Sequence, residues 1–278
     1  MRLDLRLGST VLVFVAFGLL VGAAWWRGTR PAAHDHGTES SRVDDAESPS
    51  EMEVARADVS PEGQLVLAAA EGDLERIRDL LGEGVSPEAR NTRGRQPLHF
   101  AAAFGQPEAI RLLAAEGAGL DAPDEIGWSP LTWAAWQGSL EGTRTLIALG
   151  ADPDARYPPN QVTPLAQLMA AWHMAEDGAP EAPPLVLEER AEIARVLLEA
   201  EADPNIEGGS GLPLDTALFL EDATLVALFF DHGARIGDLW SAKFFIRQPG
   251  PIGDLVRAAA EREGLSESEV LAQGRRNP

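Results

Sequence analysis

The sequence predicts an all-α solenoid, in which short helix pairs stack on one another along the chain. The phrase at residues 96–102, QPLHFAA, recurs 33 residues later at residues 129–135 as SPLTWAA. Each phrase is followed by an apolar run that has helical spacing and ends at a glycine, Gly117 or Gly150. A fixed period of this kind is the sequence signature of a repeat architecture.

Extending the period outward gives about five helix–turn–helix units in a repeat region at residues 61–237. Residues 95–127 and 128–160 follow the pattern well. The first unit, 61–94, and the fifth, 210–237, are atypical, as terminal units that cap a stack are expected to be. The fourth unit, 161–209, carries an insertion at about residues 172–188. Residues 238–278 are predicted to form capping helices, and Ser266 and Glu269 have the spacing of a capping box at the start of the last one.

Each element of a unit has a local chemical reason. A proline such as Pro97 or Pro130 suits the first turn of a helix, because the N–H that it lacks would have no helical partner there. Leucine pairs such as Leu112 and Leu113 supply the apolar stripe of the second helix. The glycine after that helix favours the left-handed conformation of a C-cap. Because one unit cannot cover its own apolar face, several units must stack.

The Pro-Leu-His-x-Ala phrase at residues 97–101 and the 33-residue period resemble those of the ankyrin repeat family. The resemblance implies a non-enzymatic scaffold for protein–protein interaction, with no cofactor. It also implies that the partner binds on the concave face of the stack, at the turn before each Pro-Leu phrase and at the exposed end of the first helix. On this chain those partner-binding positions are Arg90, Arg93, Arg95, Phe104, Glu125, Ile126, Trp128, Trp136, Gln137 and Arg156.

These positions combine arginines with two tryptophans, Trp128 and Trp136, and both residue types are enriched at interface hot spots. The chain as a whole has a net charge of −21, so a strip that holds four arginines differs from the rest of it. We therefore predict a protein or peptide partner with an acidic surface and an apolar anchor. An alternative interpretation is that both tryptophans only pack between neighbouring turns.

The N-terminal part contains a candidate membrane segment. Residues 7–26 form a run without a charged residue, after a short head at residues 1–6. A helix of about 20 residues spans the roughly 30 Å of a hydrocarbon core. We predict an uncleaved transmembrane helix with Trp25 and Trp26 at the membrane interface. A signal peptide that is cleaved after Ala24 is the alternative. Residues 27–60 have few large apolar side chains and are predicted to form a disordered acidic linker.

These features together predict a single-pass protein of a bacterial inner membrane, with the repeats on the periplasmic side. The short head favours a cytoplasmic N-terminus, although the arginines on the two sides of the run do not decide the orientation. Cleavage would instead leave a periplasmic or secreted protein.

The composition argues against several classes of function. A net charge of −21 argues against general nucleic-acid binding, which needs a basic surface. The chain has no cysteine and so no thiolate zinc site. His34 and His36 alone do not supply the three or four ligands of a metal site. The resemblance to the ankyrin repeat family implies that His99, in its Pro-Leu-His phrase, is structural. No nucleophile–base pair has a recognisable spacing, so an enzyme with its site in the insertion is only an alternative.

Overall fold

The computed structural model describes residues 60–273, apart from position 92 and residues 177–186, 209–210 and 237–240. All of these residues belong to one compact unit, Pro49–Pro278. Within them the chain is helical and contains no strand. The predicted head, the predicted membrane segment and the linker up to residue 59 lie outside the described residues. Within the described part, no helix has the length and apolar character that crossing a bilayer requires.

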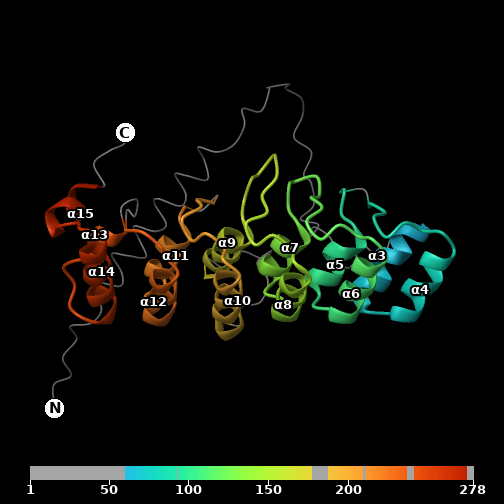
Figure 1. Ribbon diagram of the computed structural model, residues 1–278, viewed down its shortest axis with the longest axis horizontal. Helices are drawn as coiled ribbons and strands as arrows, with labels where there is room; N and C mark the ends of the chain where they lie inside the picture. Colours follow the sequence, from blue (N-terminus) through green and yellow to red (C-terminus); the bar gives the residue numbers. More distant parts are fainter. Residues whose placement is uncertain (1–59, 92, 177–186, 209–210, 237–240, 274–278) are drawn as a thin grey trace, which may run out of the picture. The chain divides into compact units, whose positions relative to one another are not determined.

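Five helix pairs follow one another along the described chain (Figure 1). They are α3 (Pro61–Glu71) with α4 (Leu74–Gly82), α5 (Pro97–Ala103) with α6 (Pro107–Ala115), α7 (Pro130–Gln137) with α8 (Leu140–Leu149), α9 (Pro164–Glu176) with α10 (Leu187–Glu199), and α11 (Pro213–Phe219) with α12 (Ala223–Asp231). Each pair lies within one of the five predicted units. Helices α13 (Ala242–Phe245), α14 (Pro251–Arg262) and α15 (Glu267–Gln273) follow the last pair.

The pairs stack so that their helices form two rows. Helices α3, α5, α7, α9 and α11 each pack against the next member of this series, which we call the first row. Helices α4, α6, α8, α10 and α12 do the same and form the second row. Helix α14 packs against α12 and so covers the last member of the second row. In Figure 1 the pairs stand next to one another in chain order.

The core lies between the two rows and depends on small residues at the contacts. Leu98 and Leu131 of the first row and Leu113 and Leu146 of the second row are fully buried in one cluster. A Cβ atom added at Gly142 of α8 would lie 2.2 Å from the carbonyl oxygen of Ala102 in α5. Because the two backbones come this close, no other residue fits at Gly142.

The predicted helix ends are confirmed where the structure describes them. Gly117 and Gly150 have φ angles of 96° and 93°, which is the left-handed C-cap conformation. In the fourth unit Glu201 takes this conformation, with φ 67°. The capping box also forms, since the Ser266 N–H donates to Glu269 Oε2 at 2.8 Å and the Glu269 N–H donates to Ser266 Oγ at 3.3 Å.

Candidate functional site

Two loops of the same geometry lead into α5 and α7. Asn91 Oδ1 accepts hydrogen bonds from the backbone N–H groups two and four residues further on, both at 3.0 Å. Thirty-three residues later, Asp124 Oδ1 accepts the equivalent bonds at 3.0 and 2.9 Å. Gly94 and Gly127 follow three residues after these acceptors, and both have positive φ. A Cβ atom at Gly127 would lie 2.2 Å from the Tyr157 carbonyl oxygen, so successive loops are in close contact.

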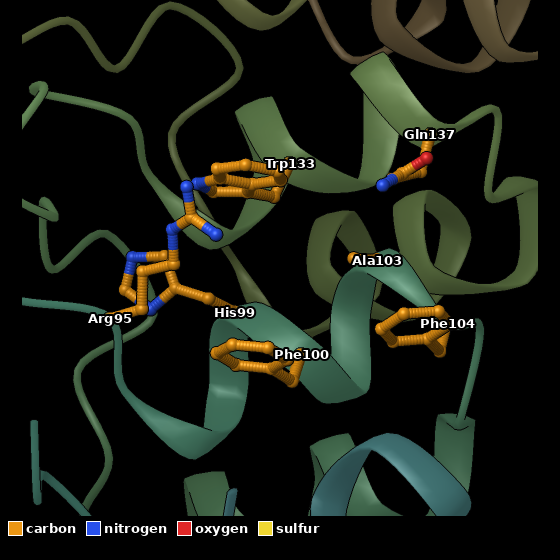
Figure 2. Close-up of a pocket in the computed structure, with 7 residues that line it drawn as sticks. All are labelled: Arg95, His99, Phe100, Ala103, Phe104, Trp133 and Gln137. Atoms are coloured by element: carbon orange, nitrogen blue, oxygen red, sulfur yellow. The ribbon is translucent and has the colours of Figure 1, made fainter. Parts of the chain in front are cut away.

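The carboxylate of Asp124 joins the second and third units. Its Oδ2 accepts a hydrogen bond from Trp133 Nε1 at 3.0 Å and lies 3.5 Å from Arg95 Nε in an ion pair. The Arg95 guanidinium also lies over the Trp133 ring, 3.9 Å from its centroid, as Figure 2 shows. All three side chains are buried, with Asp124 only 6% exposed. A single buried carboxylate therefore holds one loop, one tryptophan and one arginine together.

Three tryptophans pack against one another next to this loop. The Trp128 ring centroid lies 4.9 Å from that of Trp133 and 5.6 Å from that of Trp136, with tilted planes in both pairs. Such tilted contacts at 4.5–7 Å are favourable for aromatic rings. Trp133 is buried, whereas Trp128 and Trp136 are half-buried and keep part of their rings at the surface. The alternative interpretation was that Trp128 and Trp136 only pack between neighbouring turns. Both rings do pack against other aromatic rings, but neither residue is fully buried.

Phe100 and Phe104 extend this aromatic surface along α5, where it meets α3. Phe100 packs with Val66 and Ala70 of α3 in a cluster separate from the main core, and Phe104 and Leu67 lie against it. Since Leu98 and Ala101 of the same helix face the main core, this cluster lies on the other side of the first row. We call this surface the aromatic face; it consists of Phe100, Phe104, Trp128, Trp133 and Trp136.

A shallow cleft between α5 and α7 opens on the aromatic face (Figure 2). Its lining residues are Arg95, His99, Phe100, Ala103, Phe104, Trp133 and Gln137. The cavity volume is about 10 Å³, which is close to the minimum that holds one water molecule. Ligand pockets for small molecules have volumes of roughly 300–1,000 Å³. The cleft therefore offers a contact surface rather than a small-molecule site.

Side chains from later units hold the C-terminal ends of α3 and α7, two helices of the first row. Gln106 Nε2 donates to the Ala70 carbonyl at 3.1 Å, and Arg190 Nη2 donates to the Trp136 carbonyl at 3.2 Å. Arg190 is buried, and this burial lowers its pKa to about 10. Its Nη1 also donates to the Leu168 carbonyl of α9 at 3.4 Å. The last turn of α7 is thus fixed by the fourth unit.

His99 is structural, as the sequence predicted. Its Nδ1 accepts a hydrogen bond from the Gln96 N–H at 3.1 Å, so its Nε2 carries the proton and donates to the Trp128 carbonyl at 3.2 Å. The side chain is buried, and burial lowers the pKa of His99 from 6.5 to about 4. A neutral imidazole therefore links the start of α5 to the loop before α7.

The predicted partner-binding residues differ in burial: four are half-buried, five are exposed, and Arg95 is buried. Phe104, Trp128, Trp136 and Gln137 are half-buried and lie together on or beside the aromatic face. The exposed ones are the loop residues Arg90, Arg93, Glu125, Ile126 and Arg156. Of these, Arg90 donates from Nη1 to the carbonyls of Gly94 and Pro123, both at 2.9 Å, and Arg156 lies beside Asp154, in the loop after α8.

The expectation of an exposed Arg95 is wrong. Its side chain is 9% exposed, because the Asp124 carboxylate and the Trp133 ring cover it. A buried arginine that is paired in this way contributes to folding and is not available to a partner. Arg95 therefore does not belong to the accessible part of the predicted arginine strip.

Asp124, Phe100 and Trp133 belong to the site, although they were not among the predicted residues. Asp124 could have been found, because Asn91 precedes it by one repeat and each is followed by a glycine three residues on. Phe100 and Trp133 likewise occupy one repeat position, three residues after Pro97 and Pro130. The shared repeat position predicts that both side chains lie on the same face of the stack. It does not predict which side chains on that face are buried.

Within the described ranges, no group of three or more His, Cys, Asp and Glu side chains could hold a metal ion. His34 and His36 lie outside the described residues, as does the part of the insertion at residues 177–186.

The comparison with known protein families identifies the part of the chain that carries the aromatic face. A family model described as ankyrin repeats, three copies, matches residues 65–157, which contain the whole aromatic face. A search among curated proteins finds no match to this chain. Ankyrin repeats are typically non-enzymatic and indicate a protein–protein interaction module. The period in the sequence, the stacked helix pairs and the family match agree, and residues 65–157 are therefore ankyrin repeats.

Proposed function

We propose that this chain is a non-enzymatic, membrane-tethered interaction protein that binds a protein or peptide partner on the aromatic face. The observation that carries the proposal is the position of Phe104, Trp128 and Trp136. These large side chains are half-buried. Trp128 packs against Trp136 and Trp133, and Phe104 lines the same cleft as Trp133. Aromatic residues at the centre of an interface often carry most of the binding energy.

The shape of the surface favours a macromolecular partner. A cavity of about 10 Å³ leaves no room for a small ligand, so affinity must come from contact over a wider area. The aromatic face extends over α5 and α7, and the α3 side chain Leu67 packs beside it. An extended segment or a helix of a partner could contact several of these side chains at once.

The tether is the part of the proposal that rests on the sequence alone. The charge-free run at residues 7–26 has the length and composition of a single membrane span, and we place the repeats on the periplasmic side of a bacterial inner membrane. We expect the chain to remain in the membrane fraction after alkaline carbonate extraction. A soluble product whose N-terminal sequencing begins near Trp25 would show that the segment is a cleaved signal peptide.

The aromatic face can be tested by site-specific photo-crosslinking of the full-length chain in cells. A crosslinking amino acid at Gln137, beside the cleft, is expected to give a discrete adduct with a partner. The double substitution Phe104→Ala and Trp136→Ala should weaken that complex by more than tenfold, which corresponds to about 1.4 kcal/mol. Arg95 is not substituted here, because its burial ties it to folding.

A crosslinker at Leu149 serves as the matched control, since this side chain is 40% exposed at the end of α8 in the second row. It should not give the same adduct. The melting temperature of the double variant should stay within a few degrees of the parent, because both side chains are already partly exposed. An adduct at Gln137 that survives both substitutions would exclude the aromatic face as the binding site.

A further inference from the structure

A row of carboxylates, one after each of α3, α5 and α7, follows closely along the chain on the helices that carry or flank the aromatic face. Helices α3, α5 and α7 are each followed by a turn of two or three residues, and the next helix begins with an acidic residue in its first turn. Phe104 is thus followed closely by Glu108 of α6, and Trp136 by Glu141 of α8. The Glu108 and Glu141 side chains are 65% and 62% exposed. Glu71 and Glu75 extend the row beside α3, and both are exposed.

Neighbouring arginines do not cancel this row. Arg111 lies 3.3 Å from Glu108, and Arg144 lies 3.9 Å from Glu141, in pairs three residues apart on the same helix. Exposed pairs of this kind contribute about 0–1 kcal/mol, so the carboxylates can exchange partners at little cost. Arg144 is also shared with Glu192 of α10, at 2.9 Å.

Two arginines of the predicted strip are engaged within the fold. Arg95 is buried against Asp124 and Trp133. Arg90 is exposed, but its guanidinium is engaged by two backbone carbonyls of the loops. The uncharged aromatic side chains are therefore bordered by negative charge, in a chain whose net charge is −21. A field of this sign attracts positively charged partners and repels acidic ones.

We propose that the aromatic face binds a segment that combines a large apolar side chain with flanking lysines or arginines. The apolar side chain would contact Phe104 and Trp136, and the basic residues would pair with Glu108 and Glu141. This assignment rests on the proposed function. It gives the partner the opposite charge to the one expected from the sequence, because Arg90 and Arg95 of the arginine strip behind that expectation are engaged within the fold.

Selection from a random-peptide display library on the immobilised full-length chain tests the charge of the partner. The expected result is enrichment of peptides with Lys or Arg next to an aromatic or large aliphatic residue. A fluorescent synthetic peptide of the enriched sequence should bind much more tightly than its counterpart in which Glu replaces each Lys and Arg. Raising the salt from about 50 to 500 mM should weaken the first peptide, since exposed charges are screened.

The site is tested with two variants of equal net charge. Glu108→Gln with Glu141→Gln should weaken the basic peptide about fivefold, as expected for two exposed charge pairs. Glu116→Gln with Glu199→Gln removes the same charge directly after α6 and at the C-terminal end of α10, and it should leave binding within twofold. Equal weakening by the two variants would overturn the proposed role of the carboxylate row.

The outcomes separate this inference from the proposed function. Enrichment of acidic peptides whose binding is lost in the Phe104→Ala and Trp136→Ala variant would overturn the charge assignment and leave the aromatic face as the binding site. Basic peptides that bind this variant as well as the parent would overturn the assignment to this face. Recovery of no peptide that depends on Phe104 and Trp136 would count against both proposals.

Discussion

Replacing Asp124 by alanine is expected to lower the free energy of unfolding by about 3–5 kcal/mol, the usual cost of removing one partner of a buried ion pair. The substitution leaves the Arg95 guanidinium buried without its carboxylate and removes the acceptor of the Trp133 Nε1 hydrogen bond. It also removes two backbone hydrogen bonds of the loop before α7. Urea denaturation of the parent and the variant measures the difference.

The repeat itself supplies the matched control for this substitution. Asn91 makes the same two backbone hydrogen bonds one unit earlier, and no ion pair or tryptophan bond is found for its side chain within the described residues. Asn91→Ala should therefore cost no more than about 1–2 kcal/mol. In an Arg95→Met background the cost of Asp124→Ala should also fall, because no buried cation remains. Equal losses for Asn91→Ala and Asp124→Ala would show that the buried pair contributes nothing to stability.

His99→Gln is expected to remove a pH-dependent loss of stability between about pH 6.5 and 4. The pKa of His99 falls from 6.5 to about 4 on folding, because burial disfavours the imidazolium. As the pH drops below 6.5 the unfolded state takes up a proton that the folded state does not bind, so the free energy of unfolding decreases. The stability that is fully present above pH 6.5 falls by about 3 kcal/mol at pH 4.

Glutamine can accept from the Gln96 N–H and donate to the Trp128 carbonyl, as His99 does, but it does not titrate in this range. Chemical denaturation at several pH values between 4 and 7.5 compares the parent with His99→Gln. The two stability curves should lie close together at neutral pH and separate toward pH 4, where the parent has lost about 3 kcal/mol that the variant keeps. Parallel curves over this range would mean that His99 titrates alike in the folded and unfolded states.

The sequence by itself determined the architecture of the repeats. The first turn at Pro97 and Pro130 and the left-handed C-caps at Gly117 and Gly150 follow from residues within one repeat. The structural role of His99 was expected from its Pro-Leu-His phrase. Such features depend on local conformational preferences, which act in the same way in each unit. Because the pattern repeats, equivalent residues occupy equivalent positions in each unit, and each unit packs against its neighbours in chain order.

Only the tertiary structure decided which of the equivalent side chains remain accessible. Arg95 is covered because Asp124 and Trp133, 29 and 38 residues away in the sequence, meet it across two units. Trp133 is buried while Trp136, one turn later in α7, stays half-exposed. Burial depends on which neighbours arrive from other units, and a repeat pattern does not encode their size or charge. The engagement of Arg90 and Arg95 within the fold was therefore not readable from the repeat pattern alone.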